Sequence, residues 1–159
     1  WLAAAAAVAL LLGLGVVWLR MPAVPEFAAY RDDVLQRVQT DPEHLAFDSR
    51  NLANIRQWLG ERGVDANLDL PAGLASLTPH GCRLLDWNGQ KVVLICLVPK
   101  GSPHIDLLVI DRTRFRGFTP SDAPQFGQTA SMATAVWRKG GKTYLLAGKI
   151  DPERLRQLL

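Results

Sequence analysis

The first 19 residues limit what this chain can fold into more than any other feature. Residues 1–19 (WLAAAAAVALLLGLGVVWL) carry no charged side chain. As a helix they would cover about 28 Å, close to the thickness of the hydrocarbon core of a bilayer. Trp1 and Trp18 lie near the two ends, where indole rings favour the membrane interface, and Arg20 ends the run. The sequence therefore predicts a transmembrane helix at 1–19, with the lipid bilayer as its partner.

A cleaved secretory signal is the competing interpretation of this run. Such signals have a charged start, an apolar region of about 7–15 residues and a small-x-small cleavage site. Residues 19–25 (LRMPAVP) offer a poor site of that kind, so we favour a retained anchor. The sequence begins at Trp1 rather than at methionine, and we expect a fragment or a processed form. Two prolines make residues 20–25 a short, stiff linker.

Residues 26–159 are long enough for one hydrophobic core, and we expect a single α+β domain. Helical periodicity predicts two helices, at about 26–39 and 49–62, and a short helical turn near 70–77. A short last helix begins at Asp151-Pro152. Strands are predicted at 82–87, 91–98, 104–111, 129–137 and 142–147, with a long surface loop at 112–128. The expected architecture is an antiparallel sheet of about five strands with helices on one face.

Two turns define the expected hairpins. Asn88-Gly89 is the strongest short-range hairpin signal in the sequence. Gly140-Gly141 joins the two strands that carry Trp137 and Tyr144. We interpret these six residues as structural, because tryptophan in such a strand is more often a core or sheet residue than a ligand-stacking one.

Cys82 and Cys96 are the only cysteines, and both lie in the first hairpin. A strict two-residue turn at Asn88-Gly89 would point them to opposite faces of the sheet. A three-residue loop, or one shifted further, would bring them together on one face. With an anchor in front, we favour a Cys82–Cys96 disulfide formed in an oxidising compartment. Two buried free thiols are the alternative.

Metal binding is not predicted. His80, Cys82, Cys96 and His104 match no standard spacing of a zinc or copper site. The histidines are interpreted as surface residues at strand starts. No metal or cofactor is therefore expected.

The sequence gives no sign of an active site. It contains no Gly-x-Ser-x-Gly elbow, no His-Glu-x-x-His helix and no phosphate-binding glycine loop. Asp106 and Asp111 share a strand, but their odd spacing places them on opposite faces, which suits no shared acid–base site. The net charge of +3 is small and scattered along the chain, which argues against direct binding of nucleic acid. An enzyme is not expected.

The order of motifs in residues 70–159 is familiar. A strand with Gly81-Cys82-Arg83-Leu84 precedes the aliphatic strand VVLIC; Trp137, a glycine turn and Tyr144-Leu145-Leu146-Ala147-Gly148 follow later. This order resembles the extracytoplasmic C-terminal domain of bacterial membrane-anchored anti-sigma factors, and of related uncharacterised proteins encoded beside extracytoplasmic-function sigma factors. The resemblance implies a single-pass protein of the bacterial inner membrane, with residues 26–159 in the periplasm.

The same resemblance implies a function. In that family a sigma-binding module precedes the anchor, and none of it is present in this sequence, so a sigma factor is expected as a partner only through that missing module. The expected function is a sensor or regulatory domain that relays an envelope signal across the membrane. The alternative is a membrane-tethered interaction or assembly module of the cell envelope.

Overall fold

The computed structural model describes residues 25–41, 45–111, 114–119, 121–129 and 131–159. The expected membrane helix at 1–19 and most of the expected linker at 20–25 lie outside these residues. Among the helices that are described, none is both long enough and apolar enough to cross a membrane.

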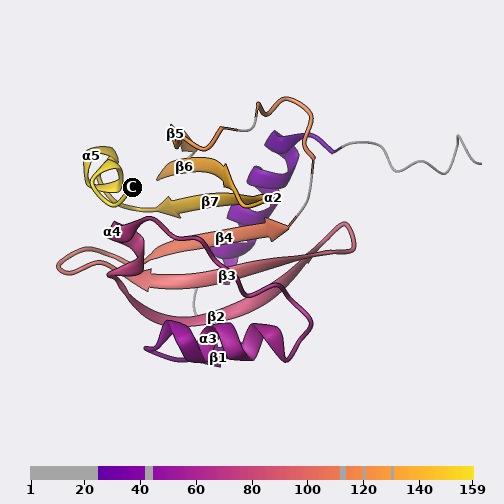
Figure 1. The fold of residues 1–159 in the computed structure, drawn as a ribbon. Coiled ribbons are helices and arrows are strands. Elements are labelled where there is room, and N and C mark those ends of the chain that lie inside the picture. The colour runs from indigo at the N-terminus through magenta and orange to yellow at the C-terminus, as the bar shows by residue number, and fades with distance from the viewer. Residues whose placement is uncertain (1–24, 42–44, 112–113, 120, 130) are drawn as a thin grey trace, which may run out of the picture.

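The sheet has more strands than the sequence predicts. The described strands are β1 (Phe47–Asp48), β2 (Thr78–Trp87), β3 (Gln90–Val98), β4 (Ile105–Asp111), β5 (Gln125–Thr129), β6 (Met132–Lys139) and β7 (Lys142–Gly148). They form one antiparallel sheet in the order β1-β2-β3-β4-β7-β6-β5 (Figure 1). The two unpredicted strands are the edge strands: β1 is only two residues long, and β5 has the sequence QFGQT, without apolar alternation.

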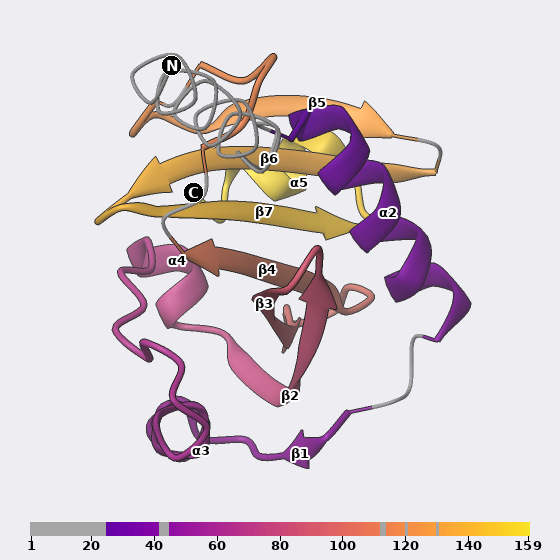
Figure 2. The ribbon, with the colours of Figure 1, turned by 90° about the vertical axis from the view of Figure 1, so that its right-hand side faces the viewer.

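Helices cover both faces of the sheet, so the expectation of helices on one face is wrong. One face carries α2 (Phe27–Thr40), which crosses it as Figure 2 shows. The opposite face packs against α3 (Leu52–Gly60), α4 (Ala72–Ala75) and α5 (Pro152–Arg156). The physical reason is that β3 and β4 are apolar at almost every position, and a strand of that kind has to be covered on both sides.

Two hydrophobic clusters result, one on each side of the sheet. Tyr30, Val34 and Leu35 of α2 are buried over one face, and Ile55 and Leu59 of α3 are buried over the other. Each helix thus presents an apolar stripe at the spacing that the sequence indicated.

Trp137 and Tyr144 are core residues. They are directly opposite each other on β6 and β7, with stacked rings whose centroids lie 5.1 Å apart. The Tyr144 hydroxyl accepts a hydrogen bond of 3.2 Å from the backbone N–H of Asp69. The pair fastens the segment before α4 to the sheet.

Both predicted turns are two-residue turns. Asn88 and Gly89 have φ angles of 51° and 75°, and Gly140 and Gly141 have φ angles of 58° and 81°. Positive φ at both central positions is the conformation that matches the twist of a hairpin. The first turn pairs Trp87 with Gln90.

Candidate functional site

The cysteines lie on opposite faces of the sheet. The strict Asn88-Gly89 turn pairs Cys82 with Ile95 and Gly81 with Cys96, so alternation points the two side chains apart. Both are buried free thiols, which differs from the expected Cys82–Cys96 disulfide. Burial raises the pKa of Cys82 to about 11, and burial and the charge of Asp106 raise the pKa of Cys96 to about 12. Neither thiol is activated for chemistry.

The histidines and cysteines considered as metal ligands are not brought together. Cys82 belongs to the core under α3, whereas Cys96 faces α2. His80 lines a surface groove, and His104 lies beside Asp106. In the part of the chain that the structure describes, no three His, Cys, Asp or Glu side chains are placed to hold a metal ion.

Asp106 was considered only together with Asp111, and it was not predicted as a site residue. It lies on β4 directly opposite Cys96, and its side chain is only 9% exposed. It opens into a pocket of about 210 Å³ at the C-terminal end of α2. The other side chains at this pocket are Val38, Gln39, Pro103, His104, Met132 and Lys149. We call this cavity the Asp106 pocket.

The Asp106 carboxylate is poorly compensated. Its nearest basic neighbour is His104, whose Nε2 lies 3.8 Å from Oδ2, too far for a hydrogen bond. None of the described residues donates a hydrogen bond to either oxygen. Burial raises the pKa of Asp106 to about 6, although His104 and Arg83 act in the opposite direction. Arg83 is itself bound to Asp41 at 3.0 Å.

A signal for Asp106 was present in the sequence. The strand HIDLLVID carries an aspartate among buried aliphatic residues, and a charge at such a position is rare without a partner or a function. The pocket itself was not predictable, because α2, the loop before β4 and the ends of β6 and β7 meet only in the folded chain.

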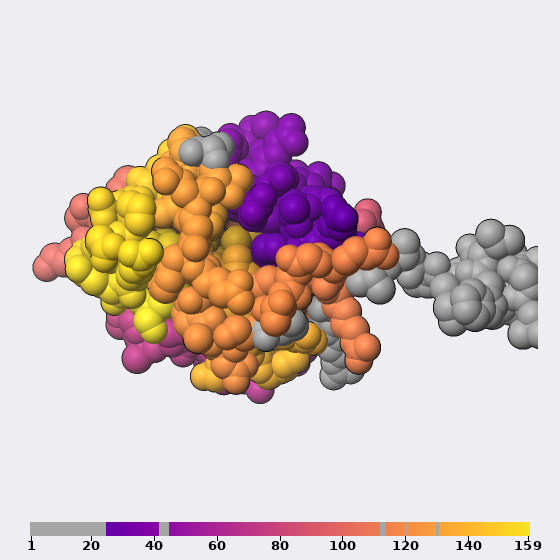
Figure 3. All heavy atoms as spheres, turned by 90° about the horizontal axis from the view of Figure 1, so that it is seen from above, coloured from indigo at the N-terminus to yellow at the C-terminus, as the bar shows by residue number. Residues whose placement is uncertain are grey.

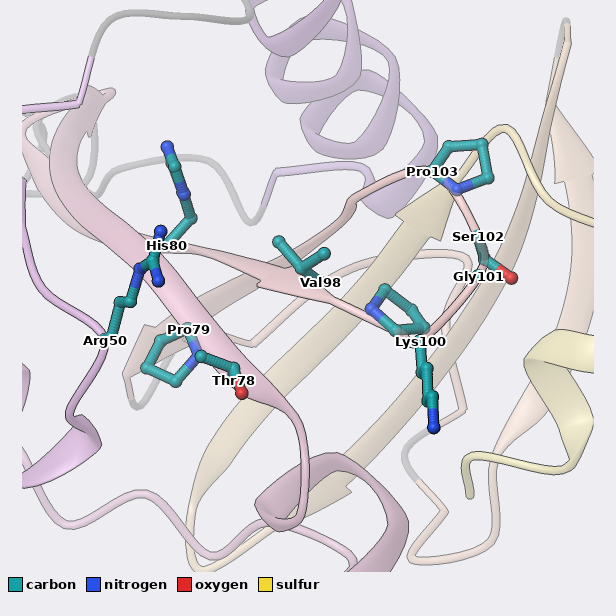
Figure 4. Close-up of a pocket in the computed structure, with 10 residues that line it drawn as sticks. Arg50, Thr78, Pro79, His80, Val98, Lys100, Gly101, Ser102 and Pro103 are labelled. Carbon is teal, nitrogen blue, oxygen red and sulfur yellow. The ribbon is translucent and has the colours of Figure 1, made fainter.

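A larger groove of about 820 Å³ lies on the other side of the loop between β3 and β4 (Figure 4). Arg50, His80 and Lys100 border it, and Val98, which is 41% exposed, lies between them. No carboxylate lines this groove. Pro103 lines both the groove and the Asp106 pocket, so one loop separates the two cavities.

The opposite end of α2 is held by an aromatic cluster. Its members are Phe27, Tyr30, Trp87, Phe115 and Phe118. Phe27 stacks on Phe118 with centroids 4.6 Å apart, and Tyr30 packs on Trp87 at 5.0 Å. We call this cluster the aromatic clamp, and Figure 3 shows residues 114–119 against the start of α2.

Backbone hydrogen bonds reinforce the aromatic clamp. The N–H of Phe27 donates to the carbonyl oxygen of Arg116 at 3.0 Å, and the N–H of Arg116 donates to that of Pro25 at 2.8 Å. The first residues that the structure describes, Pro25 to Phe27, are thus attached to the loop that follows β4.

One helix connects the two features. Val38 and Gln39, near the C-terminal end of α2, line the Asp106 pocket, and Phe27 and Tyr30 in its first turn belong to the aromatic clamp. A helix of 14 residues spans about 21 Å, so a single element reaches from the pocket to the clamp.

Comparison of the chain with protein-family models, with curated proteins and with solved structures found no match. The function is therefore inferred from the sequence and from the geometry of these sites.

Proposed function

We propose that residues 26–159 are the regulatory domain of a single-pass membrane protein of the anti-sigma-factor kind, and that the domain lies in the periplasm. The observation that carries this proposal is the path of α2. It runs from the Asp106 pocket to the aromatic clamp. In the sequence, the clamp residue Phe27 comes soon after the apolar run at 1–19 and the linker at 20–25.

The physical basis is a shift between two packings of α2. A ligand or partner that contacts the pocket shifts such an equilibrium only by its difference in affinity for the two packings. Because Val38 and Gln39 line the pocket, a bound molecule contacts the helix directly. The clamp then transfers the change to the segment that leads to the anchor.

The periplasmic placement is supported by the family resemblance. The two free thiols supply no argument for an oxidising compartment. An alkaline phosphatase reporter fused after Leu159 tests the placement, because this enzyme becomes active only outside the cytoplasm. High phosphatase activity is expected, and a stable full-length fusion without phosphatase activity would contradict the proposed orientation.

A chimera tests the relay. Residues 1–159 are joined behind the sigma-binding module of a characterised anti-sigma factor, and transcription from its promoter is measured. Phe27→Ala removes the centre of the clamp and is expected to change transcription by about fivefold or more, the scale of ordinary allosteric coupling. Phe126→Ala is the matched control, since Phe126 is 39% exposed on β5. Equal output from the unaltered chimera and both variants would contradict the relay.

A second function, an interaction module of the envelope, is favoured by β5. This edge strand is exposed along most of its length and carries the exposed Phe126, and unpaired edges readily accept another strand. This function predicts that chemical cross-linking in membranes joins the chain to a partner protein. These cross-links are expected to be lost in Phe126→Ala and retained in Phe27→Ala. Unchanged cross-links in Phe126→Ala would contradict it.

A further inference from the structure

We propose that the Asp106 pocket binds a small zwitterion such as an aliphatic amino acid, with its ammonium group on the Asp106 carboxylate and its anionic group toward Lys149. This inference rests on the proposed function for its biological role, because it names the ligand class that the regulatory domain would respond to.

The ammonium end follows from the carboxylate. A buried charge is costly unless it is paired and hydrogen-bonded, and a carboxylate has about four acceptor positions. The Asp106 side chain is 91% buried, and within the described part of the chain the one basic side chain within 4 Å of its carboxylate is His104, at 3.8 Å. Asp106 lines the pocket itself. An ammonium group supplies both the charge and the hydrogen-bond donors that are missing.

The anionic end follows from Lys149. This exposed side chain lines the same pocket, and no ion pair joins it to Asp106. A ligand with a positive charge alone would meet repulsion from Lys149, whereas a carboxylate on the ligand would be attracted to it. The pocket therefore matches a molecule with both charges.

The size and the walls of the pocket limit the rest of the ligand. Val38, Pro103 and Met132 supply apolar surface. A volume of about 210 Å³ is smaller than the roughly 300–1,000 Å³ of pockets for drug-sized molecules. A short aliphatic side chain fits these walls, and its contact with Val38 joins the ligand to α2.

The experiment uses the full chain in detergent micelles and isothermal titration calorimetry at pH 7.5. The probes are L-valine, isobutylammonium, which has no carboxylate, and isovalerate, which has no ammonium group. Valine is expected to bind saturably, and both one-charge probes to bind at least about tenfold more weakly, which corresponds to one lost charged contact. Asp106→Asn is expected to abolish valine binding. Asp122→Asn, an exposed carboxylate on another loop, is the matched control.

Lys149→Ala provides an independent variant at an exposed position that does not threaten the fold. It is expected to make the affinities for valine and isobutylammonium nearly equal. Equal affinities in the unaltered chain would overturn the assignment of the anionic end. Unchanged valine binding in Asp106→Asn, or no binding of any probe at about 20 mM, would overturn the proposal as a whole.

The pH dependence gives a second readout. A proton competes with the ammonium group for Asp106, so valine binding is expected to weaken by about tenfold from pH 7.5 to pH 5. The titratable or charged groups around this carboxylate are Cys96 on β3, Arg83 on β2, His104 and Lys149. Binding that is equally strong at both pH values would contradict an ionised Asp106 as the contact.

Failure of the relay and failure of the ligand assignment are distinguishable. If valine binds as described while Phe27→Ala leaves transcription from the chimera unchanged, the ligand site is supported and the anti-sigma function is wrong. If the chimera responds to Phe27→Ala while valine does not bind, the relay stands and the ligand class is wrong.

Discussion

Asp106 is the residue whose side-chain chemistry fits its buried position least well. A carboxylate within an apolar strand is unfavourable for folding, and the described residues compensate it poorly. Such a cost is tolerated where a site needs the group. This is the reason for placing the candidate site at Asp106 rather than at the more open groove around Arg50.

Asp106 gives the fold a characteristic pH dependence. Because its pKa is raised to about 6 in the folded chain, the folded state binds more protons than the unfolded state between about pH 4 and pH 6. Its contribution to stability is therefore most favourable below pH 4 and is lost as the pH rises through 6. Asp106→Asn is expected to stabilise the full chain by about 2 kcal/mol at pH 7.5 and by little at pH 4.

Urea denaturation of both proteins at the two pH values measures this difference. Asp122→Asn controls for the loss of one negative charge from the surface. An Asp106→Asn chain that is less stable than the unaltered chain at pH 7.5 would mean that the carboxylate has a partner and is no ligand site.

The cysteines provide a second prediction at this scale. Cys82 and Cys96 are 0% and 7% exposed, and burial raises the pKa of both thiols. In the native chain both thiols are expected to react with a thiol reagent more than about tenfold more slowly than after denaturation, since the thiolate is the reactive form. Two reactive thiols should appear in denaturant without reductant. Thiols that appear only after reduction would contradict the observed register of the hairpin.

At the scale of single elements, the turns were predictable and the edges were not. Asn88-Gly89 carries a strong local signal, and the observed register follows from it. The cysteine pairing was wrong because the sequence leaves the loop length open, and one residue of shift reverses every side chain. The strand β5 has no apolar alternation, so only its pairing with β6 reveals it.

A glycine pair tests the first turn. Gly89 has φ of +75°, where a side chain is strained, so Gly89→Ala is expected to lower the free energy of unfolding by about 1 kcal/mol. Gly60 ends α3 with open space around it, so Gly60→Ala is expected to be neutral or to stabilise by up to about 1 kcal/mol. Thermal denaturation followed by circular dichroism compares them. Equal effects would contradict the two-residue turn.

The helix α2 gives the corresponding test of packing. Phe27 is 8% exposed and contacts three other rings of the clamp. Phe27→Ala is expected to lower the free energy of unfolding by about 3 kcal/mol, the scale for a buried phenylalanine. Phe126 is half-exposed, so Phe126→Ala is expected to lower the free energy of unfolding by less than about 1 kcal/mol. Similar losses in both variants would show that the clamp does not hold the helix.

For the whole molecule, the aliphatic strands decide the architecture. A strand was predicted at 91–98, and the structure places β3 between β2 and β4 with helices on both faces. The expected five strands and one-sided helices were wrong, because edge strands and the side on which a helix packs depend on contacts far apart in the chain. The α+β class was predictable from the order of helical and strand periodicity.

The central claim is that the Asp106 pocket and the aromatic clamp are coupled through α2. Hydrogen exchange of the full chain in lipid nanodiscs at pH 7.5 tests this claim most directly. The amides to follow are those of Phe27 in the clamp and of Arg116, whose backbone is bonded to it. The reference is the amide of Val64, which is bonded to Leu59 at the end of α3.

Asp106→Asn removes the uncompensated charge beneath α2. The account predicts that exchange at Phe27 and Arg116 then slows by about fivefold or more relative to Val64. Slower exchange that is confined to Val38 and Gln39, with the clamp amides unchanged relative to Val64, would contradict the coupling and with it the proposed relay.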